Sequence, residues 1–97
     1  MPINIYAEGG GEKLAYLCER NWRLPDQVDA LEAWLKENGS KLKSGHYVAD
    51  IGFTPREDAS GGGAALSPEM MRTMADLGMS LFLSEYPGEN ELLRHPG

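Results

Sequence analysis

The sequence has little cysteine and little positive charge, and both shortages narrow the range of functions. Cys18 is the only cysteine, so no disulfide can form within the chain, which fits a reducing compartment. Nine basic residues stand against fifteen acidic ones, the formal net charge is −6, and the lysines and arginines are scattered. Because proteins that bind phosphate backbones need clustered basic residues, we expect no nucleic-acid partner.

Long apolar runs and targeting signals are lacking too. No apolar stretch approaches the ~20 residues of a membrane-spanning helix. Residues 1–4 show no basic region leading into an apolar segment, as a signal peptide would. We therefore expect a cytoplasmic protein with no membrane partner. The chain has 97 residues, of which 41% are hydrophobic and 25% charged, and this is typical of one small folded domain with a thin core.

The signatures of catalysis and metal binding are missing as well. Cys18, His46 and Asp50 are of the types that serve as nucleophile, base and orienting acid, but no local signature surrounds Cys18. A zinc site needs three or four closely spaced ligands, whereas His46 and His95 are the only histidines and lie far apart in the sequence. We therefore expect no catalytic residue, no metal and no cofactor.

The first twenty residues predict a β-hairpin. Residues 3–6 alternate apolar and polar side chains, as a strand does, and the three glycines at 9–11 end that strand. Residues 12–20 favour a partner strand, with a short helix as the alternative because their apolar side chains also share a helical face. The glycines before Lys13 do not form a phosphate loop, which needs spaced glycines and a Ser or Thr after the lysine.

A first helix is indicated over residues 25–37. Pro25 suits the first helical position, and Asp26 in the first turn complements the helix dipole. Asn38 and Gly39 predict a left-handed stop. One apolar stripe with helical spacing joins Val28, Leu31 and Leu35.

A second helix is indicated after residue 67. Ser67 is a typical N-cap, Pro68 and Glu69 suit the first turn, and Gly78 ends the helix. The predicted buried stripe consists of Met71, Met74 and Leu77, helped by Met70. Methionine-rich faces can also bind partners, but the helical spacing favours the core.

Two further strands complete the pattern. Residues 46–53 have apolar side chains on both faces, which indicates a central strand, and residues 79–84 form the last strand. Residues 54–64 predict a flexible, glycine-rich loop, and residues 87–97 a frayed tail.

The element order is therefore β-β-α-β-α-β. We expect a single α+β domain over residues 1–97, with a four-stranded, mostly antiparallel sheet and two helices on one face. The other face of the sheet is then open to solvent, a ligand or a second chain.

Five residues are the candidates for binding. Trp22 and Arg23 precede the first helix, and Trp and Arg are frequent interface anchors. Trp22 fits equally well a staple-like contact with the start of that helix. Tyr47 is expected on the open sheet face, and Glu57 and Asp58 lie in the glycine-rich loop.

Two stretches of the sequence carry a family resemblance. Trp22-Arg23-Leu24-Pro25 leads into the first helix, and Leu66-Ser67-Pro68-Glu69 opens a helix that stops at Gly78 before a strand ending near Tyr86. Over residues 22–86 this order resembles the bacterial family called domain of unknown function 4279. The resemblance implies an α+β fold in a bacterial cytoplasmic protein, and some such proteins look like immunity proteins of toxin systems. It brings no catalytic residues.

Three functions are compatible with the sequence. The first is a non-catalytic protein-binding module of immunity type, whose acidic surface would speed association with a basic partner. The second is a homo-oligomeric structural or accessory protein that covers its thin core by self-association. The third is a small-molecule binder or small enzyme with a site on the open sheet face, near Tyr47 and the glycine-rich loop.

Overall fold

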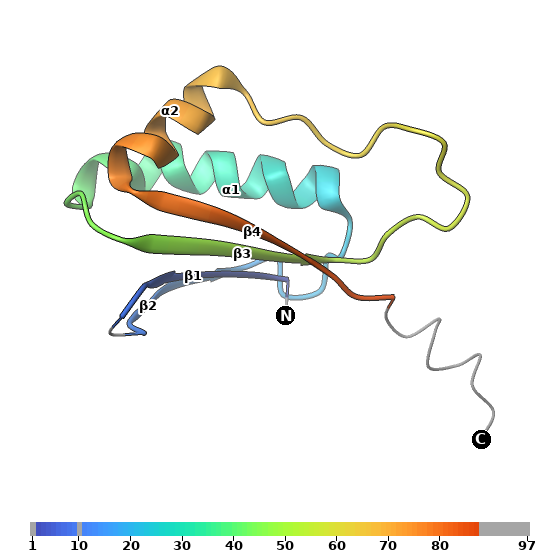
Figure 1. The fold of residues 1–97 in the computed structure, drawn as a ribbon, viewed down its shortest axis with the longest axis horizontal. Helices are drawn as coiled ribbons and strands as arrows, with labels where there is room; N and C mark the ends of the chain where they lie inside the picture. Colours follow the sequence, from blue (N-terminus) through green and yellow to red (C-terminus); the bar gives the residue numbers. More distant parts are fainter. Residues whose placement is uncertain (1, 10, 88–97) are drawn as a thin grey trace.

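The computed structural model describes residues 2–9 and 11–87, which form the expected α+β fold (Figure 1). The elements are β1 (Ile3–Ala7), β2 (Lys13–Leu17), α1 (Leu24–Asn38), the 3₁₀ turn η1 (Gly39–Lys41), β3 (Tyr47–Phe53), α2 (Pro68–Leu77) and β4 (Met79–Glu85). The order β-β-α-β-α-β is confirmed. His95 and residues 88–97 of the predicted tail lie outside the described residues.

The four strands form one mixed sheet in the order β2-β1-β3-β4. β1 pairs antiparallel with both β2 and β3, while β3 and β4 run parallel, so the sheet is mostly antiparallel as expected. The strand prediction for residues 12–20 is confirmed by β2. The hairpin turn before it is closed by the amide of Ala7, which donates to the Glu12 carbonyl at 2.8 Å, and Gly9 and Gly11 supply positive φ angles.

Both helices cover the same face of the sheet (Figure 1). Side chains alternate between the two faces of a strand, and Ile3, Ile5, Ala49 and Ile51 of the two central strands face the helices and are buried. The core of buried residues consists of Ile3, Ile5, Ala49, Ile51 and Met79 from the strands and Val28, Leu31, Leu35, Met70, Met74 and Leu77 from the helices. The hydrophobic core is therefore a single layer between sheet and helices.

The apolar stripe of α1 and the predicted end of the helix near residue 37 are confirmed, but the predicted left-handed stop is wrong. Gly39 has φ −57° and ψ −40°, a right-handed conformation that continues directly into η1. A Cβ atom on Gly39 would lie 3.2 Å from Cγ2 of Thr73 on α2. Glycine here eases the close approach of the two helices and does not form a left-handed turn.

The start and end of α2 follow the sequence signals. Ser67 Oγ accepts a hydrogen bond from the Met70 amide at 3.0 Å, and Gly78 is left-handed with φ 78°. The predicted stripe is wrong by one residue, because Met70 is buried and Met71 is 50% exposed. Residues 70, 74 and 77 follow the spacing i, i+4, i+7 and share the face toward the core.

The face of the sheet opposite the helices is only partly open. Val48 is 2% exposed although it lies outside the helix-side core, which agrees with the prediction that β3 is buried on both faces. Beside it, Ser84 Oγ donates to Asp50 Oδ1 at 2.8 Å across the β3–β4 pair. Phe82 on the edge strand is 50% exposed on this face.

Candidate functional site

Segments that are far apart in the sequence meet at the end of the sheet where α1 begins. The Thr54 amide donates to the Trp22 carbonyl at 2.9 Å, and the Tyr86 amide donates to the Phe53 carbonyl at 2.8 Å. The rings of Trp22 and Tyr86 pack edge to face, with centroids 5.7 Å apart and planes at 75°. Trp22 therefore joins the loop before α1 to the end of β4, a contact that neither sequence interpretation foresaw.

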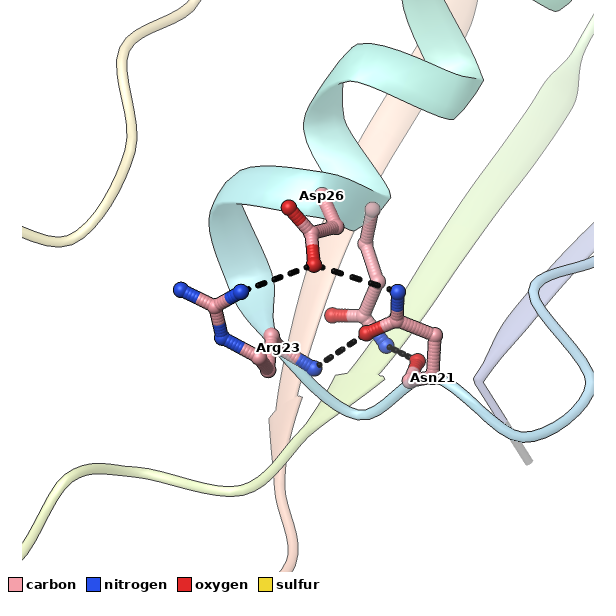
Figure 2. Close-up of polar contacts among 4 residues, drawn as sticks. Asn21, Arg23 and Asp26 are labelled. Atoms are coloured by element: carbon pink, nitrogen blue, oxygen red, sulfur yellow. Dashed lines mark hydrogen bonds and ion pairs between the residues drawn. The ribbon is translucent and has the colours of Figure 1, made fainter.

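A polar network holds the first turn of α1 (Figure 2). Arg23 Nη1 and Asn21 Nδ2 both donate to Asp26 Oδ2, at 3.1 and 3.2 Å, and the Arg23 amide donates to Asn21 Oδ1 at 3.0 Å. The Arg23 side chain is 74% exposed, so its ion pair with Asp26 contributes little to stability. The network fixes the backbone at the start of α1 and leaves the guanidinium of Arg23 accessible.

Gln27 lies fully buried below this network. Its Nε2 donates to the carbonyls of Asn21 and Gly52, both at 2.7 Å. Its Oε1 has no hydrogen-bond partner among the described residues. Gln27 thus connects α1 to the loop before it and to the end of β3, and it was not among the residues expected to matter.

A groove of about 450 Å³ lies between the start of α1 and the segment that follows β3. Figure 1 shows this segment running from β3 out past the end of the sheet before it turns back to α2. The groove's walls are mainly apolar, and two cationic side chains, Arg23 and Arg56, line it as well. The apolar residues are Leu24, Pro25, Phe53, Pro55 and Ala59.

Arg56 was not identified from the sequence. Its Nη2 donates to the Gly61 carbonyl at 2.7 Å, and a Cβ atom on Gly62 would lie 3.0 Å from the same nitrogen. The glycines of this loop therefore let the backbone fold closely around the guanidinium. No spacing pattern relates residues 23 and 56, so only the folded chain brings the two arginines to one groove.

The other predicted binding residues are placed differently. Tyr47 packs against the core on the helix side of the sheet, and its hydroxyl donates to the Lys43 carbonyl at 2.5 Å. The expectation that Tyr47 lines the open face is therefore wrong, because strand alternation puts it with Ala49 and Ile51. Glu57 and Asp58 are exposed on the loop next to Arg56, outside the lining of the groove.

Cys18, His46 and Asp50 do not form a catalytic group. Cys18 follows the end of β2, His46 precedes β3 at the opposite end of the sheet, and Asp50 is bonded to Ser84 on the face away from the helices. Burial raises the pKa of the Cys18 thiol, and the negative charge of Asp26 adds to the shift. A raised pKa disfavours the thiolate, which is the nucleophilic form.

Among residues 2–9 and 11–87, no group of three or more His, Cys, Asp or Glu side chains is arranged to hold a metal ion. In the same part of the chain, neither helix combines the length and the apolar character that crossing a membrane requires. No protein-family model, no curated protein and no solved structure matches the chain. The resemblance to domain of unknown function 4279 stays a prediction.

Proposed function

We propose that the protein is a non-catalytic binding protein that holds a segment of a partner protein in the groove beside Arg23. The observation that carries this proposal is the pairing of apolar walls with two arginines in one groove of about 450 Å³. Apolar walls with a few placed polar groups are typical of binding sites. Two of the binding candidates predicted from the sequence, Trp22 and Arg23, lie at the end of the sheet where α1 begins.

The two guanidinium groups indicate the chemistry of the bound segment. A guanidinium pairs with a carboxylate through two parallel hydrogen bonds, and such charge-assisted bonds are about twice as strong as neutral ones. The exposed ion pair between Arg23 and Asp26 costs little to exchange for a carboxylate of the partner. We therefore propose a segment with an acidic side chain next to an apolar one, which contacts Leu24, Pro25 and Phe53.

The negative charge outside the groove favours a partner with basic residues around the acidic side chain that binds in the groove. The chain carries a formal net charge of −6, and Glu57 and Asp58 are exposed on the same loop as Arg56. An acidic surface speeds association with a basic partner. An immunity-type protein that masks a basic toxin is one such arrangement, and the family resemblance supports it. A cytoplasmic location belongs to the same proposal, since a single cysteine fits a reducing compartment.

The test is affinity capture of the tagged protein from an extract of its own host at low salt, followed by the same capture with Arg23→Ala/Arg56→Ala. A stoichiometric partner that the wild type retains and the double variant loses would support the proposal. The matched control is Lys36→Ala/Arg72→Ala, which removes the same charge at exposed positions outside the groove lining and should retain the partner. Equal capture by all three proteins, or no partner at all, would contradict it.

A small-molecule binder is the second candidate, and the size of the groove favours it. Ligand sites span roughly 300–1,000 Å³, and the groove lies within that range. A panel of carboxylate metabolites should then raise the melting temperature of the wild type but not that of Arg23→Ala/Arg56→Ala. No shift with any compound would leave the protein partner as the better account.

A further inference from the structure

The two edge strands of the sheet differ in how they are protected. Edge strands commonly avoid pairing with other chains by means of lysine, proline or a bulge. At one edge β2 begins with Lys13, and its register with β1 shifts between Ile5 and Tyr6. At the other edge β4 (Met79–Glu85) has no lysine, no proline and no register shift against β3, and its one charge, Glu85, is at its end.

The sequence of the unprotected strand is symmetric. Residues 80–84 read Ser-Leu-Phe-Leu-Ser, a palindrome centred on Phe82. Phe82 and Leu83 are 50% and 54% exposed, on opposite faces of the strand. Exposed apolar side chains are normal when they are single, but here two adjacent ones lie on a strand edge that pairs with none of the other described strands.

We propose that β4 pairs antiparallel with β4 of a second copy of this chain, about a two-fold axis that passes through Phe82. This register places Leu81 opposite the partner subunit's Leu83, and Ser80 opposite the partner subunit's Ser84. Phe82 faces its own counterpart across the axis. A two-fold interface requires a surface that complements itself, and over residues 80–84 the palindrome pairs serine with serine, leucine with leucine and Phe82 with its own counterpart.

The backbone of β4 agrees with this register. The amide of Tyr86 points toward β3, since it donates to the Phe53 carbonyl at 2.8 Å. Amide direction alternates along a strand, so the amides and carbonyls of Leu81, Leu83 and Glu85 point away from β3. In the proposed dimer, Leu81 and the partner subunit's Leu83 form a hydrogen-bonded pair, and Leu83 and the partner subunit's Leu81 form another. Phe82 and its counterpart form the non-hydrogen-bonded pair between them.

The pairing extends the core across the interface. Leu81 packs against the helix-side core, whereas Leu83, on the same face, is 54% exposed. Placing the partner subunit's Leu81 beside Leu83 covers this exposed side chain. The two Phe82 rings meet on the other face, where aromatic pairs between strands stabilise a sheet. Glu85 faces the partner subunit's Met79, so the two paired strands place no like charges opposite each other.

The native mass as a function of concentration tests the proposal. The wild type should approach twice the monomer mass as its concentration rises through the micromolar range, in light scattering or sedimentation equilibrium. Leu83→Lys should stay monomeric, because the new charge enters the interface while its position in the monomer is exposed. The matched control is Met71→Lys, at an equally exposed apolar position on α2, which should still dimerise. A wild type that is monomeric at every concentration would overturn the proposal.

Disulfide trapping tests the register and does not depend on the lysine variant folding. In a Cys18→Ser background, Phe82→Cys should form a covalent dimer with a mild oxidant, because Cα atoms of a non-hydrogen-bonded pair lie about 4.5 Å apart, within reach of a disulfide. Ser80→Cys should not, since its counterpart is offset by four residues, or about 14 Å along the strand. Equal trapping at both positions would refute this register. The groove at Arg23 plays no part in either experiment, so the two proposals succeed or fail separately.

Discussion

The two helices look alike in the sequence and are built differently. Each has a proline in its first turn and a glycine directly after its last residue. α2 begins with the side chain of Ser67 as its cap and ends at left-handed Gly78. α1 has Arg23 at its N-cap position with no side-chain cap hydrogen bond, and Gly39 after the helix is right-handed. The difference is that α2 is delimited by its own residues, whereas α1 is delimited by contacts with other parts of the chain.

The contacts that delimit α1 also build the candidate site. Gln27 reaches the carbonyl of Gly52, which lies 25 residues further along the sequence, and Asn21 bonds to both Arg23 and Asp26. The groove opens beside this first turn. Substitutions at the ends of the two helices therefore separate local from tertiary control, and the following predictions run from the largest expected effect to the smallest.

Gly78→Ala should have the largest effect. A left-handed conformation costs a non-glycine residue about 1–2 kcal/mol, and a Cβ atom here would also overlap the Gly45 carbonyl. We expect a loss of about 3 kcal/mol or more in the free energy of unfolding, measured with urea. Gly39→Ala is the control: its backbone is right-handed, and a small shift of Thr73 makes room, so the change should stay within about 1 kcal/mol. Similar losses at both positions would contradict the contrast between the two helix ends.

Gln27→Leu should come next. The substitution removes the donor of two hydrogen bonds, so the buried carbonyl of Gly52 and the partly buried carbonyl of Asn21 lose this partner. An unsatisfied buried group costs about 1–3 kcal/mol, so we expect a loss of about 2 kcal/mol or more in the free energy of unfolding. Lys36→Leu places the same side chain at an exposed position of α1 and should be nearly neutral. A Gln27→Leu protein as stable as this control would show that α1 does not depend on its tertiary contacts.

Ser67→Ala should cost about 1 kcal/mol, as loss of an N-cap usually does. Ser67 Oγ accepts from the Met70 amide and also donates to Glu32 Oε2 at 2.7 Å. Ser67→Asn keeps a capping acceptor and should recover most of the loss in the same urea titration. A loss larger than that of Gln27→Leu would reverse the order that the structure predicts.

The smallest effect concerns Cys18, near the start of α1. Its pKa is raised in the folded state, first by burial and then by the charge of Asp26. Because the pKa is raised, the neutral Cys18 thiol makes its full contribution to stability below the unfolded-state pKa. This contribution is lost as pH rises through the folded-state pKa. The free energy of unfolding should therefore fall between about pH 8 and pH 10 more in the wild type than in Cys18→Ser. Parallel pH profiles of the two proteins would contradict this linkage.

The sequence predicts the architecture better than the site. The cap of α2, Ser67 on the Met70 amide, was predicted correctly because the two residues are neighbours in the chain. The left-handed stop predicted from Asn38 and Gly39 was wrong, because Gly39 packs against Thr73 of α2 in a right-handed conformation. Met74, Leu77 and the helping Met70 are buried as predicted, but the inclusion of Met71 was wrong. Periodicity defines a stripe only to within about one residue, and packing against the sheet decides which residue is buried. The placement of Tyr47 on the open face was wrong for a similar reason, since alternation along a strand does not show which face the helices cover.

By itself the sequence determined the α+β class, the order of the elements, the cap and stop of α2, and the acidic charge. These properties depend on composition, periodicity and contacts between near neighbours. Only the tertiary structure decided that Gly39 serves helix packing, that Trp22 meets Tyr86, and that two arginines 33 positions apart line one groove. Such contacts depend on the path of the whole chain, because residues distant in sequence interact only once the sheet and helices have brought them together.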